Sequence, residues 1–359
     1  MRKVYSVALA LLLFTLNQFI PAEANSTSSS SAKVNTGCSA KGAEALTLKG
    51  AVLCDGKFWR LIPEKSETIQ SKAFRSVLQR WNSRQKSELS LAIYADPKAG
   101  DWTKRIAKGI GAGAEFWGTS EAGSRTMPVI ISNDYKYIEK VLAKLKIPQN
   151  PADKKRNAQA QGGQAGFHGS WDDPSAYWDF LYTSPDALNN SGFWQVPAHE
   201  YSHFAQSKLS NRNWSGPGGL AWMDEGVPSY IGAVLGPMSD MPSDIMNSWK
   251  SDLKRTKVNL KFFDSADDRV HSSPNWSDVY PLGAVAVEAL VALVGFEAIY
   301  RYYSDLSSSL TMEDSYIKNF GLSGKRLTVF LSEYVQSVKV GKPWTLQQLS
   351  NKYLAESNH

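Results

Sequence analysis

The feature that most constrains the fold of this chain is a pair of histidines four residues apart, His199 and His203, in the segment VPAHEYSHFAQ (residues 196–206). Residues four apart lie on one face of an α-helix, one turn above the other, so a helix brings both imidazoles to a single point. Pro197 is tolerated only in the first turn, which predicts that the helix begins near residue 195. The fold must therefore leave room beside this helix for a group that both imidazole rings can contact.

This group is predicted to be a metal ion. Two imidazoles placed in this way can bind one ion, and the glutamate beside them, Glu200, can take a proton from a water molecule held there. The chain has only five histidines, and this motif contains two of them. The alternative is an amphipathic helix whose histidines are buried and hydrogen-bonded in the core. A catalytic zinc site also needs a third protein ligand and an open position for water.

A candidate third ligand stands about twenty residues further along, in the segment GGLAWMDEGVPSYIG (residues 218–232). Glu225 falls in a second predicted helix, after a glycine-rich turn, and a carboxylate placed there can meet the two imidazoles. The alternative for Glu225 is an exposed helix acid. The neighbouring Asp224 has two interpretations: a partner that orients a ligand histidine, or a surface acid.

Together, H-E-x-x-H and a following W-x-D/N-E-G-x-x-x-Y resemble the gluzincin zinc metallopeptidases of the thermolysin-like peptidase MA group, especially their M1 aminopeptidase-like branch. The resemblance covers about residues 125–340. It implies three ligands for one catalytic zinc ion: His199, His203 and Glu225. Three further positions match the pattern: Trp222, Gly226 and Tyr230. Glu200 is implied as the general base, whereas Asp224 stands where these aminopeptidases often have asparagine.

The resemblance also implies a residue that stabilises the oxyanion of the reaction intermediate. These enzymes carry Tyr-x-x-Gly at the start of a later helix, and Tyr280 with Gly283 resembles it, although Leu282 replaces the family's lysine. A phenol directed at developing negative charge suits this role. The alternative for Tyr280 is a buried tyrosine with a satisfied hydroxyl. His271 is the rival candidate, because other gluzincins use a histidine here, and its alternative is an exposed loop residue.

The pattern along the chain predicts an α+β fold: a zincin-like catalytic domain, followed by a mainly helical C-terminal subdomain. The domain is expected to combine a small mixed sheet that has an edge strand with the active-site helix. The segment AYWDFLYTS (176–184) is interpreted as the edge strand against which an extended peptide lies. The other segments are expected as follows: mostly helix over 66–118, a buried strand at 126–132, a helix at 135–147, an exposed loop at 148–176 and a buried core helix at 283–295.

The N-terminal residues indicate export. A short basic region, Arg2 and Lys3, precedes the apolar run VALALLLFTL, and small residues at 22 and 24 fit cleavage after Ala24. The alternative is an uncleaved membrane anchor; the run at 283–295 is too short to span a bilayer. We therefore expect a secreted or extracytoplasmic protein (extracellular, periplasmic or cell-surface) with no stable membrane span after leader cleavage. The expected divisions are a signal peptide (1–24), a Ser-rich linker (25–37), a disulfide-stapled hairpin (38–62), the α+β zinc-binding domain (63–240) and the helical subdomain (241–359).

The chain contains only two cysteines, Cys38 and Cys54. Export favours a disulfide between them, and two free thiols are the alternative. The turn signal Asp55-Gly56 lies between two apolar runs and predicts a hairpin at this place.

These features favour a secreted zinc metallopeptidase that acts on peptide or protein substrates. M1 aminopeptidases bind the substrate amine with a Gly-x-Met-Glu-Asn loop, which is absent upstream of the zinc helix here, so an endopeptidase is favoured. One alternative is a non-catalytic zincin-fold protein that binds cell-surface or extracellular polymers, and another is a zinc hydrolase of a non-peptide amide. The net charge of +6 is scattered without a dense basic tract, which gives no support for nucleic-acid binding. The oligomeric state is not indicated.

Overall fold

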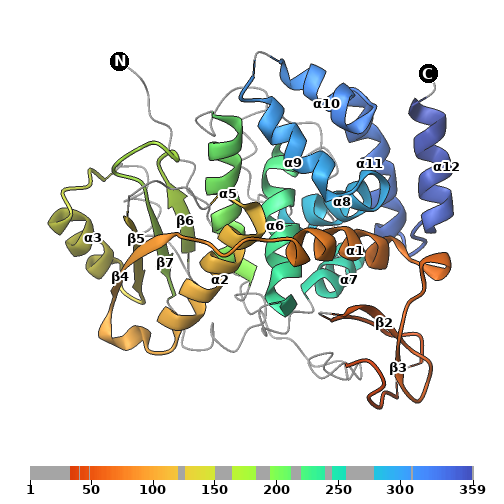
Figure 1. The fold of residues 1–359 in the computed structure, drawn as a ribbon, viewed down its shortest axis with the longest axis horizontal. Coiled ribbons are helices and arrows are strands. Elements are labelled where there is room, and N and C mark those ends of the chain that lie inside the picture. The colour runs from red at the N-terminus through yellow and green to blue at the C-terminus, as the bar shows by residue number, and fades with distance from the viewer. Residues whose placement is uncertain are drawn as a thin grey trace.

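The computed structural model describes residues 33–39, 41–47, 49–119, 126–149, 164–182, 195–211, 220–238, 245–255, 279–308 and 310–357. These residues form a mixed α+β fold with two small sheets and many helices (Figure 1). The predicted leader (1–24), most of the predicted linker and His271 lie outside the described residues.

The larger sheet has four strands in the order β4-β5-β7-β6. Their bounds are β4 (Ser90–Ala95), β5 (Thr126–Ser132), β6 (Gln164–His168) and β7 (Tyr177–Leu181). The pairs β4–β5 and β5–β7 are parallel, whereas β6 runs antiparallel to β7. The predicted small mixed sheet is therefore present, with the antiparallel strand β6 at one edge.

Two expectations about this sheet are wrong. The strand predicted at 176–184 is β7, but it lies inside the sheet, whose edges are β4 and β6. Every residue of β7 is buried, which is the pattern of an interior strand covered on both faces. Strand β6 lies in the segment predicted as an exposed loop, because its glycine and polar residues hide a strand pattern. The stretch 66–118 is mostly helical, as predicted, and strand β4 interrupts it.

Helices cover both faces of the sheet. Helix α3 (Tyr135–Lys144), as predicted, packs with Ile130 and Leu181 on one face. On the other face, Trp178 and Phe180 join the main core together with α2 (Trp102–Trp117) and α5 (Val196–Ser210). Figure 1 shows α5 between the sheet and the remaining helices.

The rest of the fold is helical. Its helices are α1 (Ile69–Asn82), α6 (Ala221–Met238), α7 (Ile245–Arg255), α8 (Val279–Val294), α9 (Phe296–Asp305), α10 (Met312–Phe320), α11 (Gly324–Lys339) and α12 (Leu346–Ser357), with short 3₁₀ turns at Glu64–Ser66 and Pro97–Ala99. Helix α8 is buried almost throughout, as predicted for the apolar run at 283–295. One hydrophobic core contains residues from α1 to α12, so the core crosses the predicted division at residue 240.

None of the described helices is by itself long and apolar enough to cross a membrane. Helices α8 and α9 meet the length and composition criteria only as a pair, and they are bent by 102° where they join.

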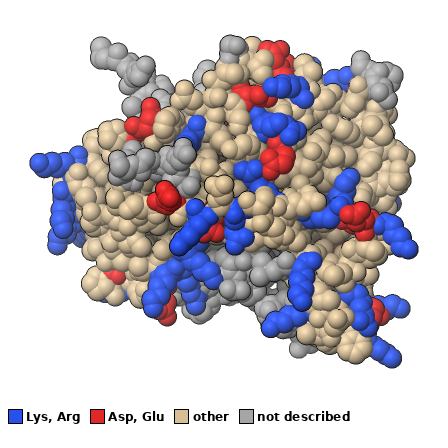
Figure 2. Space-filling view, viewed as in Figure 1, with Lys and Arg blue, Asp and Glu red and all other residues tan. Residues whose placement is uncertain are grey.

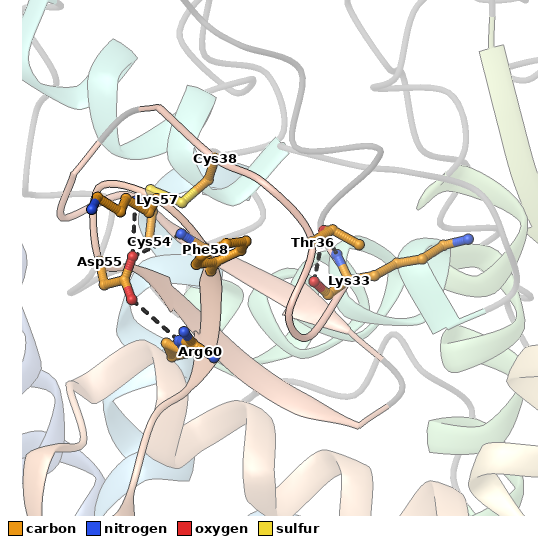
Figure 3. Close-up of a disulfide and its surroundings, with 8 residues drawn as sticks. All are labelled: Lys33, Thr36, Cys38, Cys54, Asp55, Lys57, Phe58 and Arg60. Atoms are coloured by element: carbon orange, nitrogen blue, oxygen red, sulfur yellow. Dashed lines mark hydrogen bonds and ion pairs between the residues drawn. A yellow bond between two sulfur atoms is a disulfide. The ribbon is translucent and has the colours of Figure 1, made fainter.

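The smaller sheet forms a lobe at the N-terminal end of the described chain. It consists of β1 (Glu44–Thr47), β2 (Gly50–Cys54) and β3 (Trp59–Leu61), all antiparallel, so the predicted hairpin β2–β3 has a third strand beside it. The expected disulfide between Cys38 and Cys54 is present (Figure 3). In the turn, Asp55 Oδ1 accepts hydrogen bonds from the backbone amides of Phe58 (2.7 Å) and Lys57 (2.8 Å). These bonds, with one from Arg60, lower the pKa of Asp55 to about 2.

Removal of the disulfide, in a Cys38→Ser/Cys54→Ser variant, is expected to lower the free energy of unfolding by about 3 kcal/mol, because the unfolded chain gains the entropy of an open loop. The lobe shares Ala51 with the main core, so its loosening should register in the global transition. Denaturant unfolding measures the change, and reduced wild-type protein serves as the control. Equal unfolding midpoints for the oxidised wild type and the variant would refute the stabilising role.

Candidate metal centre

Helix α5 supplies the two histidines and the glutamate between them. Its first turn contains Pro197, and Gln195 is the N-cap residue, so the helix begins where the sequence predicts. Thirteen of its fifteen residues are buried, because the sheet covers one side and helices cover the other. A helix buried all round needs close neighbours on every side, and these neighbours set the position of His199 and His203.

Three ligand atoms from two helices converge at one point. The Nε2 atoms of His199 and His203 lie 3.1 Å apart, and Glu225 Oε2 of α6 lies 3.3 Å from His203 Nε2 and 3.5 Å from His199 Nε2. All three residues are buried. Zinc bonds of about 2.0–2.1 Å in a tetrahedron place ligand atoms about 3.4 Å apart, close to these separations. Among the described residues, these three form a group that can hold a metal ion.

The protonation of two of the three ligands, His199 and Glu225, suits a cation. Burial lowers the pKa of His199 to about 4, so its ring is neutral at neutral pH, as a metal ligand must be. Burial alone would raise the pKa of Glu225, but His203 and His199 lower it to about 2, so the carboxylate stays charged. Burial opposes a charge on His203, yet Glu225 and Glu200 raise its pKa.

The outward-facing ring nitrogens of the two histidines meet polar partners. His203 Nδ1 lies 3.1 Å from Gln206 Oε1 on the same helix, and His199 Nδ1 lies 3.3 Å from Ser229 Oγ on α6. Neither partner is predicted from the sequence, although spacing points to one of them: Gln206 follows His203 by three residues. Asp224, which was considered for this role, offers its backbone carbonyl to Gln206 instead (3.2 Å), and its side chain is only partly buried.

Glu200 is fully buried beside the ligands and is tied to the sheet edge. Its Oε2 accepts a hydrogen bond from the backbone amide of Phe167 in β6 (3.0 Å), and Oε1 has no hydrogen-bond partner among the described residues. The ring of Phe167 contacts Phe204 of α5 edge-on, with ring centroids 5.5 Å apart, which holds β6 against the helix. Burial raises the pKa of Glu200 to about 7. A carboxyl group with this pKa can take up and release a proton near neutral pH.

Tyr280 stands near the centre, at the start of α8. Its ring centroid lies 5.9 Å from that of His199, and the residue is buried. The structure thus brings one of the two candidates for oxyanion stabilisation close to the ligands. The other, His271, lies outside the described residues.

A close crossing of α6 and α8 sets the distance between Glu225 and Tyr280. A Cβ atom added at Gly226 would lie only 2.5 Å from the backbone of Gly283, and one added at Gly283 would lie 2.6 Å from the carbonyl oxygen of Trp222. The two glycines of the sequence motifs are therefore the points where the helices touch. Backbone contact at this point is possible only because neither residue has a side chain.

The crossing of α5 and α6 depends on glycine as well. A Cβ atom at Gly232 would lie 2.6 Å from the carbonyl oxygen of Gln195 and 3.2 Å from His199 Cβ. The other motif residues of α6 pack in the core: Trp222 and Tyr230 are buried, and Trp222 Nε1 lies 3.2 Å from Thr328 Oγ1 in α11. The motif on α6 thus contains the ligand Glu225 and also the residues whose packing fixes the position of this helix.

No protein-family model matches this chain, and no curated protein or solved structure matches it either. Only the motifs and the geometry of this site therefore indicate what the protein does.

On the face that Figure 2 shows, lysine and arginine side chains are spread widely and interspersed with acidic ones.

Proposed function

We propose that this protein is an exported, zinc-dependent metallopeptidase of the gluzincin type. The observation that carries the proposal is the convergence of His199, His203 and Glu225 beside Glu200, a buried carboxyl group with one oxygen that has no hydrogen-bond partner among the described residues. A site that only binds metal has no need for such a group. This favours hydrolysis over the alternative, a non-catalytic zincin-fold protein that binds cell-surface or extracellular polymers.

The chemistry is divided between the ion and the chain. Zinc held by the three ligands would supply a Lewis acid for a scissile carbonyl and lower the pKa of a water molecule. Glu200 takes the proton of the attacking water at Oε1 and then delivers it to the leaving nitrogen. The amide of Phe167 holds the other oxygen of Glu200 and so fixes the direction of the carboxyl group.

Strand β6 is the surface on which a peptide substrate would lie. It pairs with β7 on one side, and no strand pairs with its other side among the described residues. An extended peptide can add to such an edge through main-chain hydrogen bonds. The same strand holds Glu200, so a peptide on β6 lies beside the proton-transfer group. A peptide that adds to a sheet edge in this way can be an internal stretch of a chain, which agrees with an endopeptidase.

Cleavage of a peptide library by the purified, zinc-loaded mature protein tests this function. Cuts at internal positions, abolished by a chelator and restored by zinc, are the expected result. The absence of any cleavage by protein shown to contain zinc would overturn the peptidase proposal in favour of a binding protein or of a hydrolase of non-peptide amides.

A Tyr280→Phe variant is expected to lose about 10²–10³ in kcat with little change in KM, because the phenol acts on charge that develops only in the transition state. Zinc content should stay at the wild-type level, which makes it the control. A His271→Ala variant is measured in parallel. A large loss of kcat with His271→Ala and none with Tyr280→Phe would give the role to the histidine instead.

A further inference from the structure

A buried hydrogen-bond network lies directly behind His203 and joins three helices. Its centre is Gln206 of α5, which is fully buried. The amide nitrogen of Gln206 donates to Tyr303 Oη of α9 (2.7 Å) and to the carbonyl oxygen of Asp224 in α6 (3.2 Å), while Oε1 lies 3.1 Å from His203 Nδ1. Tyr303 Oη in turn contacts the carbonyl oxygen of Met223 (3.5 Å). Helix α9 is therefore linked to the ligand His203 through Tyr303 and Gln206.

The network allows only one orientation of the Gln206 amide. The carbonyl oxygen of Asp224 can only accept a hydrogen bond, so the group that faces it must be the NH₂ of Gln206. The amide oxygen must then face His203, and this oxygen also can only accept. The hydrogen of the His203 ring therefore has to sit on Nδ1, which leaves the lone pair of Nε2 directed at Glu225 and His199.

His199 has no comparable constraint at its outer nitrogen. Its neighbour, Ser229 Oγ, lies at the longer distance of 3.3 Å and can either donate or accept by rotating its hydroxyl group. The two ligand histidines thus differ: the network holds one ring in a single tautomer, and the serine permits both tautomers of the other.

We propose that Gln206 and Tyr303 are positioning residues of the metal centre, which hold His203 in the Nδ1-protonated tautomer, in which the lone pair that binds the ion is on Nε2. The inference rests on the proposed metal site and extends it to the helices behind. Because Gln206 bonds to both α5 and α6, it also fixes the gap between the helices that carry His203 and Glu225.

Three variants separate the contributions of Gln206 and Ser229 to zinc affinity. Gln206→Leu removes the acceptor for His203 Nδ1, and zinc affinity is expected to fall 10–100-fold, as for other groups that orient a ligand. Gln206→Glu keeps an acceptor for His203 Nδ1 but loses the donor to the carbonyl oxygen of Asp224, so its zinc affinity is expected to lie between those of the wild type and Gln206→Leu. Ser229→Ala removes the hydroxyl group beside His199 Nδ1. It should lower zinc affinity less than Gln206→Leu does.

The experiment measures zinc dissociation constants by competition with a chelator, and the tautomer of His203 by ¹⁵N NMR of histidine-labelled mature protein, assigned with a His203→Gln sample. Nδ1 protonation in the wild type and in Gln206→Glu, with loss of this preference in Gln206→Leu, supports the proposal. A purely structural role would not move the tautomer. If Gln206→Leu fails to fold, Tyr303→Phe replaces it, with an expected weakening of several-fold.

Two results would overturn the inference in different ways. Zinc binding by the wild type, together with Nε2 protonation of His203 or unchanged affinity in Gln206→Leu (or in its replacement), removes the positioning role and leaves the proposed function intact. A wild-type protein that binds no zinc removes the metal centre and, with it, both proposals.

Discussion

A Glu200→Gln variant is expected to lose peptide hydrolysis by about 10³-fold or more while it binds zinc as tightly as the wild type. Glutamine has nearly the same shape, and its amide oxygen can still accept the hydrogen bond from Phe167, so the surroundings should not change. It cannot take up a proton, however, and general-base catalysis typically contributes about 10²–10⁴ in rate. The variant thus separates proton transfer from metal binding in a way that replacing a ligand cannot.

The measurement is kcat/KM on a peptide identified from the library, together with zinc content. The matched control is Glu333→Gln on α11, the same substitution at an exposed position, which should leave both quantities unchanged. A Glu200→Gln variant that hydrolyses peptide at the wild-type rate would refute the proposed mechanism. Parallel loss of zinc and activity would show instead that Glu200 supports the site structurally.

Gly226→Ala is expected to lower the free energy of unfolding by about 3 kcal/mol and to weaken zinc binding at the same time. The added methyl group would lie 2.5–2.6 Å from backbone atoms of Gly283, and a backbone cannot move aside as a flexible side chain can. Overpacking typically costs about 1–3 kcal/mol, and this contact belongs at the upper end. Alanine stabilises a helix relative to glycine by about 1 kcal/mol. A lower free energy of unfolding therefore means that the steric clash outweighs this gain in helix propensity.

The control for this prediction is Gly111→Ala in α2, where an added Cβ meets nothing within 4 Å. Its helix propensity should make that variant more stable than the wild type, by up to about 1 kcal/mol. Denaturant unfolding measures the free energy of unfolding of both variants. Competition with a chelator measures their zinc affinity, which reports whether Glu225, the residue before Gly226, has moved. If Gly226→Ala is as stable as Gly111→Ala, α6 and α8 do not cross as closely as the structure has them.

The ligand group could be predicted from the sequence because its geometry is mostly local. The spacing of His199 and His203 places both rings on one helix face, Pro197 marks the start of that helix, and Glu225 follows about twenty residues later in the next helix. A helix repeats every 3.6 residues whatever its surroundings, so a four-residue spacing has the same meaning in any fold. That zinc occupies the site, and that the protein cleaves peptides, stay predictions until the measurements above are made.

The strand order could not be predicted in the same way. The alternation of apolar residues identifies a strand but says nothing about its neighbours, so the segment 176–184 is predicted as an edge strand although its strand, β7, lies inside the sheet. The edge strand beside it, β6, contains Gly166 and follows a polar segment of the sequence, and only its pairing with β7 makes it a strand.

The sequence by itself determined the helix that carries His199, Glu200 and His203, the disulfide, and the motif that contains Glu225. Only the tertiary structure decided which strand holds Glu200 and which side chains meet the outer ring nitrogens. It also decided how closely Tyr280 approaches the ligands. The first group depends on residues near one another in the chain or on rare residue types, which leave few possibilities. The second depends on where α5, α6, α8 and β6 cross, and those crossings are set by packing between segments far apart in the sequence.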